Sequence, residues 1–235
     1  MPTLVLLRHG QSEWNQANRF NGWIDTYLSA EGQKQARAAG RKIEATGLVF
    51  DQAYSSVLSR TIMTINRLLE EANQAYVPLV KSWRLNERHY GILQGHDKDE
   101  MRAQYGKDQV QTWRRSYSVL PPKAISFSPT VTIGGQTYPA FDHRYHDVPF
   151  GLLPRSENIQ STEKRVQPLF ESGILADLQA GKDVLVVAHG TSIRALTKLI
   201  EGLTPEEVTQ VEIANGQPIR YDFSADLSTY KKSLI

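Results

Sequence analysis

Two short stretches of the chain contain only apolar residues, at positions 4–7 (Leu-Val-Leu-Leu) and 184–187 (Val-Leu-Val-Val). A strand buried on both faces of a sheet shows such an unbroken run, because neither face needs polar residues. Both stretches therefore predict strands in the interior of a mostly parallel sheet. Residues 77–83 and 218–223 predict two further strands.

Amphipathic segments lie between these strands and predict helices. Ser29 is a good N-cap for an Ala-rich helix over residues 29–46, and residues 56–73 carry apolar side chains at helical spacing. A long helix is predicted over residues 157–181, with a kink at Pro168 because proline removes a helical hydrogen bond.

This order of elements predicts an α/β fold in three layers, a mostly parallel sheet with helices on both faces. Open sheets of this kind bind ligands at the carboxyl ends of their strands, so we expect the functional site there. The 235 residues fit one catalytic domain, 1–235.

One segment, residues 118–155, does not fit the alternation. It is rich in Pro, Gly, Ser and Thr, and long irregular loops in compact domains often serve as lids or binding loops. Within it, residues 130–138 alternate around Gly134-Gly135, which predicts a two-residue hairpin. We therefore expect a lid-like insertion at about 118–155.

Composition narrows the function classes. The net charge of +2 gives no reason to expect a nucleic-acid or membrane partner, and no apolar stretch is long enough to span a bilayer. The absence of cysteine excludes disulfides, thiolate catalysis and zinc–thiolate sites. A cytoplasmic location is compatible with this composition and is our expectation.

Candidate chemistry follows the two buried strands directly. Arg8, His9 and Gly10 follow the first, and His189 and Gly190 follow the second. A neutral imidazole can attack phosphorus and form a phosphohistidine. The transferred phosphoryl group needs cations, and no acidic metal-ligand cluster stands near either histidine. Arg8, Arg60 and His189 are the candidates for that role, while the alternative for each histidine is a satisfied core residue.

A second pattern, His143-Arg-Tyr-His146 flanked by Asp142 and Asp147, contains metal-ligating residue types. The surrounding sequence is irregular and offers no further ligands, so we favour solvated side chains over a metal site.

Longer strings then indicate a family. Leu7-Arg-His-Gly-Gln-Ser-Glu-Trp-Asn15, Arg19-Phe-Asn-Gly-Trp23 and Tyr54-Ser-Ser-Val-Leu-Ser-Arg60 occur in this order. Trp83-Arg-Leu-Asn-Glu-Arg-His-Tyr-Gly-Ile-Leu-Gln-Gly95, Trp113-Arg-Arg-Ser-Tyr117 and His189-Gly-Thr-Ser-Ile-Arg194 follow. The chain resembles, over nearly its whole length, the histidine phosphatase superfamily in its cofactor-dependent phosphoglycerate mutase form.

The resemblance implies interconversion of 3-phosphoglycerate and 2-phosphoglycerate, with 2,3-bisphosphoglycerate as the primer that phosphorylates His9 and without a metal. It also implies small-molecule phosphoglycerate partners and a homodimer. Glu87 is the implied general acid/base, and we expect burial to raise its pKa toward neutrality. Arg8, Arg60 and His189 are the implied phosphoryl clamp. The other implied substrate-binding residues are Gly10, Gln11, Ser12, Glu13, Trp14, Asn15, Asn21, Gly22, Arg88, His89, Tyr90, Lys98, Arg114, Arg115, Gly190 and Thr191.

Several positions depart from the family's usual residues. Gln11 replaces a Glu, Asn21 a Thr and Thr191 an Asn, and residues 214–218 read Ala-Asn-Gly-Gln-Pro instead of Pro-Thr-Gly-Ile-Pro. The insertion with its Gly-Gly hairpin also differs, and the C-terminal tail is shorter than in many mutases. We expect these changes to affect the balance between mutase and phosphatase activity.

Two alternatives remain open at this point. A bisphosphoglycerate mutase or phosphatase, or a broader phosphomonoesterase, would use the same His9 with another acceptor. A catalytically silent phospho-ligand binding protein would need the cations but not the nucleophile.

Overall fold

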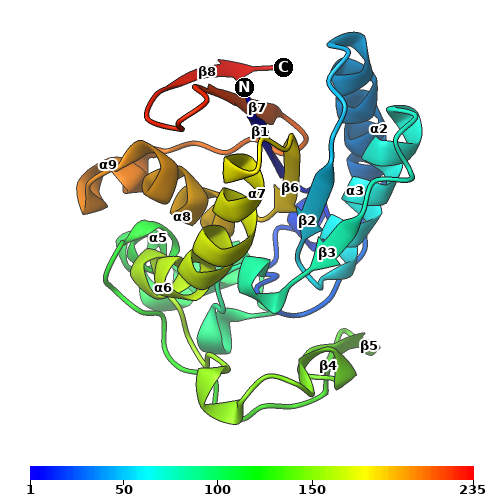
Figure 1. The fold of residues 1–235 in the computed structure, drawn as a ribbon. Helices are drawn as coiled ribbons and strands as arrows, with labels where there is room; N and C mark the ends of the chain where they lie inside the picture. Colours follow the sequence, from blue (N-terminus) through cyan, green and yellow to red (C-terminus); the bar gives the residue numbers. More distant parts are fainter.

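A six-stranded sheet forms the centre of the protein, in the order β3-β2-β6-β1-β7-β8 (Figure 1). The structure is a computed structural model that describes residues 1–235. Strands β3, β2, β6 and β1 pair in parallel, β7 runs antiparallel to β1, and β8 pairs antiparallel with β7 at the edge. The strands are β1 (Thr3–Arg8), β2 (Gln52–Ser55), β3 (Leu79–Lys81), β6 (Val184–Ala188), β7 (Pro218–Phe223) and β8 (Tyr230–Leu234).

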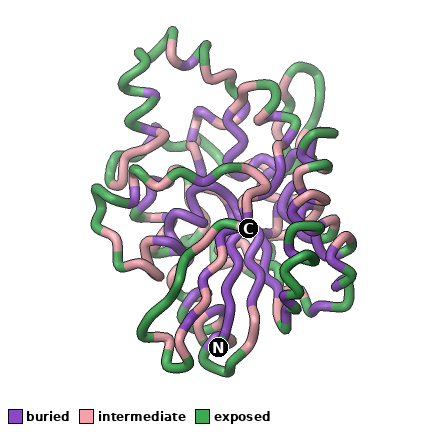
Figure 2. The backbone as a smooth tube through the Cα atoms, turned by 90° about the horizontal axis from the view of Figure 1, so that it is seen from above, coloured by how far each residue is buried: buried purple, intermediate pink, exposed green.

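The apolar runs predicted as strands are the two central ones, β1 and β6. They pair in parallel register from Leu4 with Val184 to Arg8 with Ala188. Alternate side chains serve opposite faces: Leu4 and Leu6 join one buried cluster, while Val5 and Leu7 join the other. Burial on both faces explains why neither run alternates with polar residues. In Figure 2 these central strands form the buried middle of the molecule.

Helices cover both faces of the sheet, as predicted. On one face lie α2 (Ala30–Ala45) and α3 (Ser59–Glu71), and on the other α6 (Ile159–Leu169), α7 (Leu175–Gln179) and α8 (Gly190–Glu201). The short helices are α1 (Glu13–Gln16), α4 (Lys98–Tyr105), α5 (Lys107–Arg115) and α9 (Pro205–Gln210).

Three predicted elements have different bounds in the structure. The helix predicted from residue 56 begins at Ser59, because the Ser56 hydroxyl accepts the Leu58 N–H and holds that turn outside the helix. The strand predicted over 77–83 is only Leu79–Lys81. The helix predicted over 157–181 begins at Ile159, after the Asn158 N-cap, and a π-helical turn over Phe170–Ile174 follows Pro168. The disturbance at Pro168 was predicted, whereas its π-helical form was not.

Residues 118–155 form a mostly irregular segment with one hairpin, β4 (Thr130–Ile133) and β5 (Gln136–Pro139). Gly134 and Gly135 both have positive φ, 59° and 79°, as a type I′ turn requires. The hairpin packs on residues that follow β1, because the rings of Tyr138 and Trp14 lie 4.7 Å apart. It therefore lies on the side of the sheet where the parallel strands end (Figure 1).

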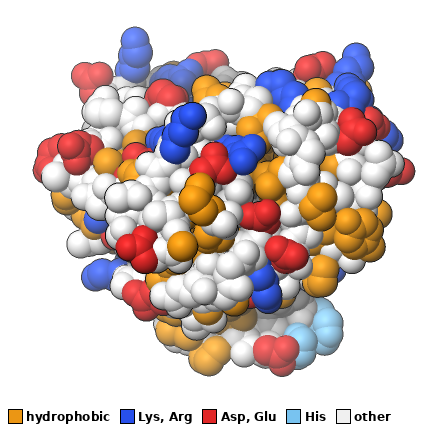
Figure 3. Space-filling view, turned by 45° about the horizontal axis from the view of Figure 1, so that its top comes forward, with side chains coloured by type: hydrophobic (Ala, Val, Ile, Leu, Met, Phe, Trp, Pro, Cys, Tyr) orange, Lys and Arg blue, Asp and Glu red, His pale blue; other side chains and the backbone are white.

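The surface carries both signs of charge. On the face drawn in Figure 3, acidic and basic side chains are interspersed, in keeping with the small net charge. None of the helices combines the length and the apolar character needed to cross a bilayer.

Candidate active site

His9 lies directly after β1 and is only 3% exposed. Its Nδ1 lies 2.6 Å from the carbonyl oxygen of Gly10. Because a carbonyl oxygen can only accept, Nδ1 carries the proton and Nε2 keeps its lone pair. Burial lowers the pKa of His9 well below its usual range, and Arg60 and Arg8 lower it further. The ring is therefore neutral and oriented at neutral pH, with a lone pair on Nε2.

Three buried nitrogens around His9 have no partner within the protein: Nε of Arg8, Nε of Arg60 and Nδ1 of His189. The two Nη atoms of Arg60 donate to the carbonyls of Gly22 and Ile24, which fixes the guanidinium. A buried polar group without a partner costs about 1–3 kcal/mol. Three of them from three elements next to one histidine indicate a site that an anionic ligand completes.

A cleft opens at the carboxyl ends of β1 and β6, and cations dominate its walls. Asn21 and Gly22 lie beside Arg60, and Lys98 and Arg114 lie at the ends of α4 and α5. The lining residues are Arg8, His9, Asn15, Arg19, Phe20, Asn21, Gly22, Arg60, Glu87, Tyr90, Lys98 and Arg114. Burial lowers the pKa of Lys98 to about 8, and Arg114, Arg102 and Arg8 contribute to the decrease.

A second compartment continues from the first at the N-terminus of α8. It is lined by Arg8, Glu87, Tyr90, Arg114, Arg115, Gly190, Thr191 and Arg194, so four residues belong to both compartments. Burial lowers the pKa of Arg194 to about 10, and the nearby Arg115 and Arg88 also lower it. The cleft therefore presents two adjoining cationic compartments, and Glu87 lies in the wall that they share.

Glu87 corrects one prediction from the sequence. Burial raises its pKa, as we expected, but the Arg88 charge, hydrogen bonding by Thr191, the Arg88 backbone N–H and the Arg8 charge together lower it more. Its Oε1 accepts the N–H groups of Thr191 and Arg88, at 3.2 and 2.8 Å. The pKa of Glu87 is therefore lowered, not raised toward neutrality as predicted, and the carboxylate is ionised at neutral pH.

Arg88, next to Glu87 in the chain, is fully buried and lines neither compartment. Its Nε donates to the Thr191 hydroxyl at 2.9 Å, and Nη1 donates to the Trp113 carbonyl. Thr191 thus holds Arg88 from one side and Glu87, through its N–H, from the other. This threonine is one of the departures noted in the sequence.

The comparisons with known proteins agree with this arrangement. The profile of the histidine phosphatase superfamily (branch 1) matches residues 4–148 and 128–233.

This chain belongs to the histidine phosphatase superfamily.

Among its relatives, a 2,3-bisphosphoglycerate-dependent phosphoglycerate mutase 2 from Lactiplantibacillus plantarum is 46% identical over 232 residues, which is 99% of this chain and 98% of the relative. The 2,3-bisphosphoglycerate-dependent phosphoglycerate mutase of Actinobacillus succinogenes is 47% identical over 229 residues, 97% of this chain and 98% of the relative.

Solved structures share the fold at lower identity. A mycobacterial glucosyl-3-phosphoglycerate phosphatase has a TM-score of 0.70 at 23% identity, covering 100% of this chain and 97% of its own. A phosphoglycerate mutase from Bacillus anthracis has a TM-score of 0.69 at 20% identity, and the match covers 99% of this chain and 92% of the mutase chain. The three-layer α/β fold predicted from the sequence is therefore confirmed as a fold of this superfamily.

Not every residue that the superfamily resemblance pointed to lines the cleft. Gly10 lies against the backbone of Gly32, where an added Cβ would come within 2.3 Å of the carbonyl oxygen. The Gln11 side chain accepts the Ser29 hydroxyl at the start of α2, and Ser12 caps α1. Glu13 and Trp14 face the hairpin instead, lining a hollow between α1 and β4–β5. These five residues build the walls behind the site.

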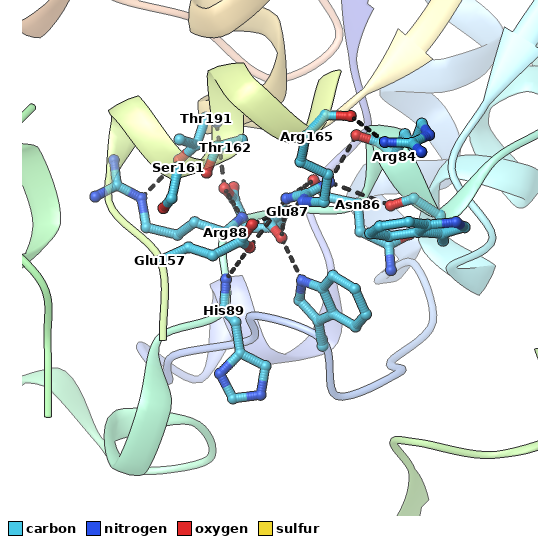
Figure 4. Close-up of polar contacts among 12 residues, drawn as sticks. Arg84, Asn86, Glu87, Arg88, His89, Glu157, Ser161, Thr162, Arg165 and Thr191 are labelled. Atoms are coloured by element: carbon cyan, nitrogen blue, oxygen red, sulfur yellow. Dashed lines mark hydrogen bonds and ion pairs between the residues drawn. The ribbon is translucent and has the colours of Figure 1, made fainter. Parts of the chain in front are cut away.

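His89 also lies outside the cleft. Its ring packs 5.5 Å from Phe141 and 6.1 Å from Trp23, and its Nδ1 accepts the Gly91 N–H. In Figure 4 the imidazole points away from Glu87 and Thr191. Burial, with a contribution from Arg165, lowers its pKa to about 3. A motif string places a residue near a site but does not fix which way its side chain turns.

The cleft also contains residues that sequence analysis missed. Arg19 and Phe20 line it, although they belong to a quoted string, and Arg194 ends another. Asn215 donates to the His9 carbonyl at 2.7 Å, and Gly216 N–H donates to the Arg8 carbonyl. The altered segment 214–218 therefore supports the backbone of Arg8 and His9. The only signal in the sequence was that residues 214–218 differ from the family's usual residues.

The alternative metal site is not assembled. The Asp142 carboxylate accepts hydrogen bonds from Arg144, and the rings of His143 and His146 stack at 4.2 Å. No three His, Cys, Asp or Glu side chains converge anywhere in the chain in a way that would hold a metal ion.

Proposed function

We propose that this chain is a 2,3-bisphosphoglycerate-dependent phosphoglycerate mutase, which interconverts 3-phosphoglycerate and 2-phosphoglycerate through a phosphohistidine at His9. One observation carries the proposal: a neutral His9, with Nε2 free, is surrounded by the unpaired nitrogens of Arg8, Arg60 and His189. The two guanidinium N–H donors placed in this way stabilise the negative charge of a transferring phosphoryl group.

The second compartment supports a mutase over a simple monoesterase. A bisphosphate carries an anion at each end, and the cleft offers cations in two places, around His9 and around Arg115 and Arg194. The N-terminus of α8 adds the backbone N–H group of Gly190, and the N-terminus of a helix favours anions. We propose that one phosphate binds beside His9 while the other end of the ligand lies in the second compartment.

In the proposed reaction, His9 Nε2 first takes a phosphoryl group from 2,3-bisphosphoglycerate. The free hydroxyl of 3-phosphoglycerate then attacks the phosphorus of phosphohistidine. The P–N bond breaks, a P–O bond forms, and Glu87 takes the hydroxyl proton. After the bisphosphate turns round, His9 attacks its other phosphoryl group, and Glu87 returns the proton to the oxygen that leaves.

The lowered pKa of Glu87 suits the first of these proton transfers, which needs a carboxylate. The return step needs the carboxylic acid. Two phosphate groups in the closed cleft would raise the pKa of Glu87 by like-charge repulsion, so the proton stays on Glu87 until the bisphosphate is cleaved. We propose that the bound ligand supplies the upward pKa shift that the protein alone does not.

The segment 118–155 is proposed as a lid. Its hairpin packs on Trp14, and the hollow between them shares Arg19 with the cleft. A closed lid excludes water, the competing acceptor, and so favours the mutase over phosphatase activity. The homodimer expected from the resemblance and the cytoplasmic location expected from the composition stay predictions.

The test is incubation with 3-phosphoglycerate in EDTA, with and without 2,3-bisphosphoglycerate, while 2-phosphoglycerate and free phosphate are followed together. Bisphosphate-dependent 2-phosphoglycerate that is lost in His9→Ala supports the proposal. Mostly free phosphate would instead assign a phosphatase. If there is neither turnover nor phosphorylation of the protein, the alternative of a catalytically silent binding protein would stand.

A further inference from the structure

The segment that carries Glu87 has little regular structure of its own. Trp83–Leu85 form a single 3-10 turn, and residues 86–90 belong to neither helix nor strand. Backbone carbonyls at this depth need hydrogen-bond partners. Because no helix or strand supplies them, side chains from elsewhere must fix the position of Glu87.

Arg165 on α6 supplies most of these partners. Its Nη1 donates to the carbonyls of Trp83 and Arg84 at 3.1 and 2.6 Å, and its Nη2 donates to those of Asn86 and Glu87 at 3.1 and 3.2 Å. The Arg165 side chain is only 5% exposed. A single guanidinium thus holds four carbonyls of the segment in which Glu87 lies.

Glu157 completes the arrangement. Its carboxylate accepts Nε and Nη2 of Arg165 at 2.7 and 3.0 Å, a bidentate pair. Its Oε2 also accepts the His89 N–H at 2.9 Å, and its own N–H donates to the His89 carbonyl. Arg165 therefore binds the backbone of the segment up to and including Glu87, while Glu157 binds its backbone at His89. Figure 4 shows these contacts converging on residues 86–89.

Nothing in this pair touches the cleft, since neither Arg165 nor Glu157 lines either compartment. We propose that Arg165, held in an ion pair with Glu157, is a positioning residue that fixes the location of the Glu87 carboxyl group. The inference rests on the proposed function for the role of Glu87, but the geometry of the segment is independent of it.

An arginine is required for this task. Lysine would keep the charge but has three donors on one atom, which cannot serve four carbonyls and a carboxylate together. A displacement of about 1 Å at a reacting group can cost about 10²-fold in rate. Arg165→Lys should therefore lower kcat by roughly 10- to 100-fold and leave KM nearly unchanged, because the cations of the cleft bind the substrate.

A displaced Glu87 would also titrate differently. The charged groups that face it are Arg88 on its own segment, Arg8 at the end of β1, Arg60 on α3 and Arg194 on α8. If the carboxylate loses its N–H bonds from Thr191 and Arg88, burial is less well compensated and its pKa rises. Loss of fold stability alone would not move this value.

The experiment compares Arg165→Lys and Glu157→Gln with Glu163→Gln. Glu163 is on the same helix and pairs with Lys198 at 3.0 Å, but contacts no residue of the Glu87 segment. Each protein is labelled with ¹³C at its glutamate carboxyls, and the Glu87 signal is assigned by its loss in Glu87→Gln. The Glu87 titration, kcat and KM are then measured well below each melting temperature.

We expect the Glu87 pKa to rise and kcat to fall in Arg165→Lys and Glu157→Gln, with Glu163→Gln unchanged. An unchanged Glu87 titration in both variants, with only a lower melting temperature, would overturn the proposal. If Arg165→Lys does not fold, Glu157→Gln decides by the same criteria. If the wild-type protein forms no 2-phosphoglycerate, the proposed function fails, while the titration still decides whether Arg165 positions Glu87.

Discussion

The rings of His9 and His189 lie edge to face with their centroids 4.9 Å apart. The strand register explains this proximity: β1 and β6 pair in parallel with Arg8 opposite Ala188, and the His9 N–H donates to the Ala188 carbonyl. Each histidine directly follows the last residue of its strand, Arg8 in β1 and Ala188 in β6. Burial, Arg60 and Arg8 lower the pKa of both rings, and His9 also lowers that of His189, so both rings stay neutral at neutral pH.

Buried neutral histidines make the fold sensitive to acid. Burial lowers the pKa of His89 to about 3, whereas the unfolded chain takes up its proton near pH 6.5. The unfolded state then binds more protons, so stability is lost as the pH falls below about 6.5. We expect His89→Gln to remove about 1.4 kcal/mol of the wild-type loss in unfolding free energy between about pH 7.5 and 5.5. Denaturant titrations at both pH values measure it, and an unchanged difference would contradict the buried neutral state.

Lys98 should make substrate binding weaken in alkali. Its pKa is lowered to about 8 by burial and by Arg114, Arg102 and Arg8, and an anion binds better to its protonated form. KM for 3-phosphoglycerate should rise above about pH 8, approaching tenfold per pH unit. Lys98→Met should raise KM at neutral pH and abolish this rise, while Lys107→Met, at the exposed first residue of α5, keeps it. A wild-type KM that is flat between about pH 7.5 and 9.5 would refute the assignment.

Glu87→Gln separates proton transfer from binding. The amide keeps the shape but cannot take a proton, so kcat should fall by about 10²- to 10⁴-fold. Affinity for inorganic phosphate should hold or improve, because a carboxylate has been removed from a cationic cleft. Stopped-flow turnover and calorimetric phosphate titration give the two values. A kcat close to wild type would exclude Glu87 as the acid/base.

The proposed lid can be loosened at one position. Ile133 is the hairpin residue that packs toward Gly95 and Trp14, whereas Thr132 beside it is exposed. Ile133→Asp should weaken that packing, admit water and raise the ratio of free phosphate to 2-phosphoglycerate by several-fold. Thr132→Asp, with the same added charge, should leave the ratio unchanged. Equal ratios in the two variants would argue against a lid.

The central strands could be predicted because strands that are buried on both faces have unbroken apolar runs in their sequence. His9 and His189 follow those strands, so their meeting at one sheet edge could be predicted as well. The position of Glu87 could not, because it depends on a guanidinium 78 residues further along the chain. Hydrophobic periodicity contains no information on such contacts.

Charge and side-chain direction were the other failures. The Glu87 pKa was predicted from burial alone, but the charges of Arg88 and Arg8 and hydrogen bonds from Thr191 and the Arg88 backbone outweigh burial. His89 was predicted in the cleft from its motif, yet packing against Trp23 and Phe141 turns it away. Both outcomes depend on tertiary neighbours that no local pattern names.

The most direct measurement is transfer of ³²P from labelled 2,3-bisphosphoglycerate to the protein, followed by acid and alkali treatment and peptide mapping. The account predicts a label that is stable in alkali, lost in acid, located on His9, absent in His9→Ala and passed to added 3-phosphoglycerate. A protein that forms 2-phosphoglycerate without labelling, or that carries the label at another residue, would contradict it.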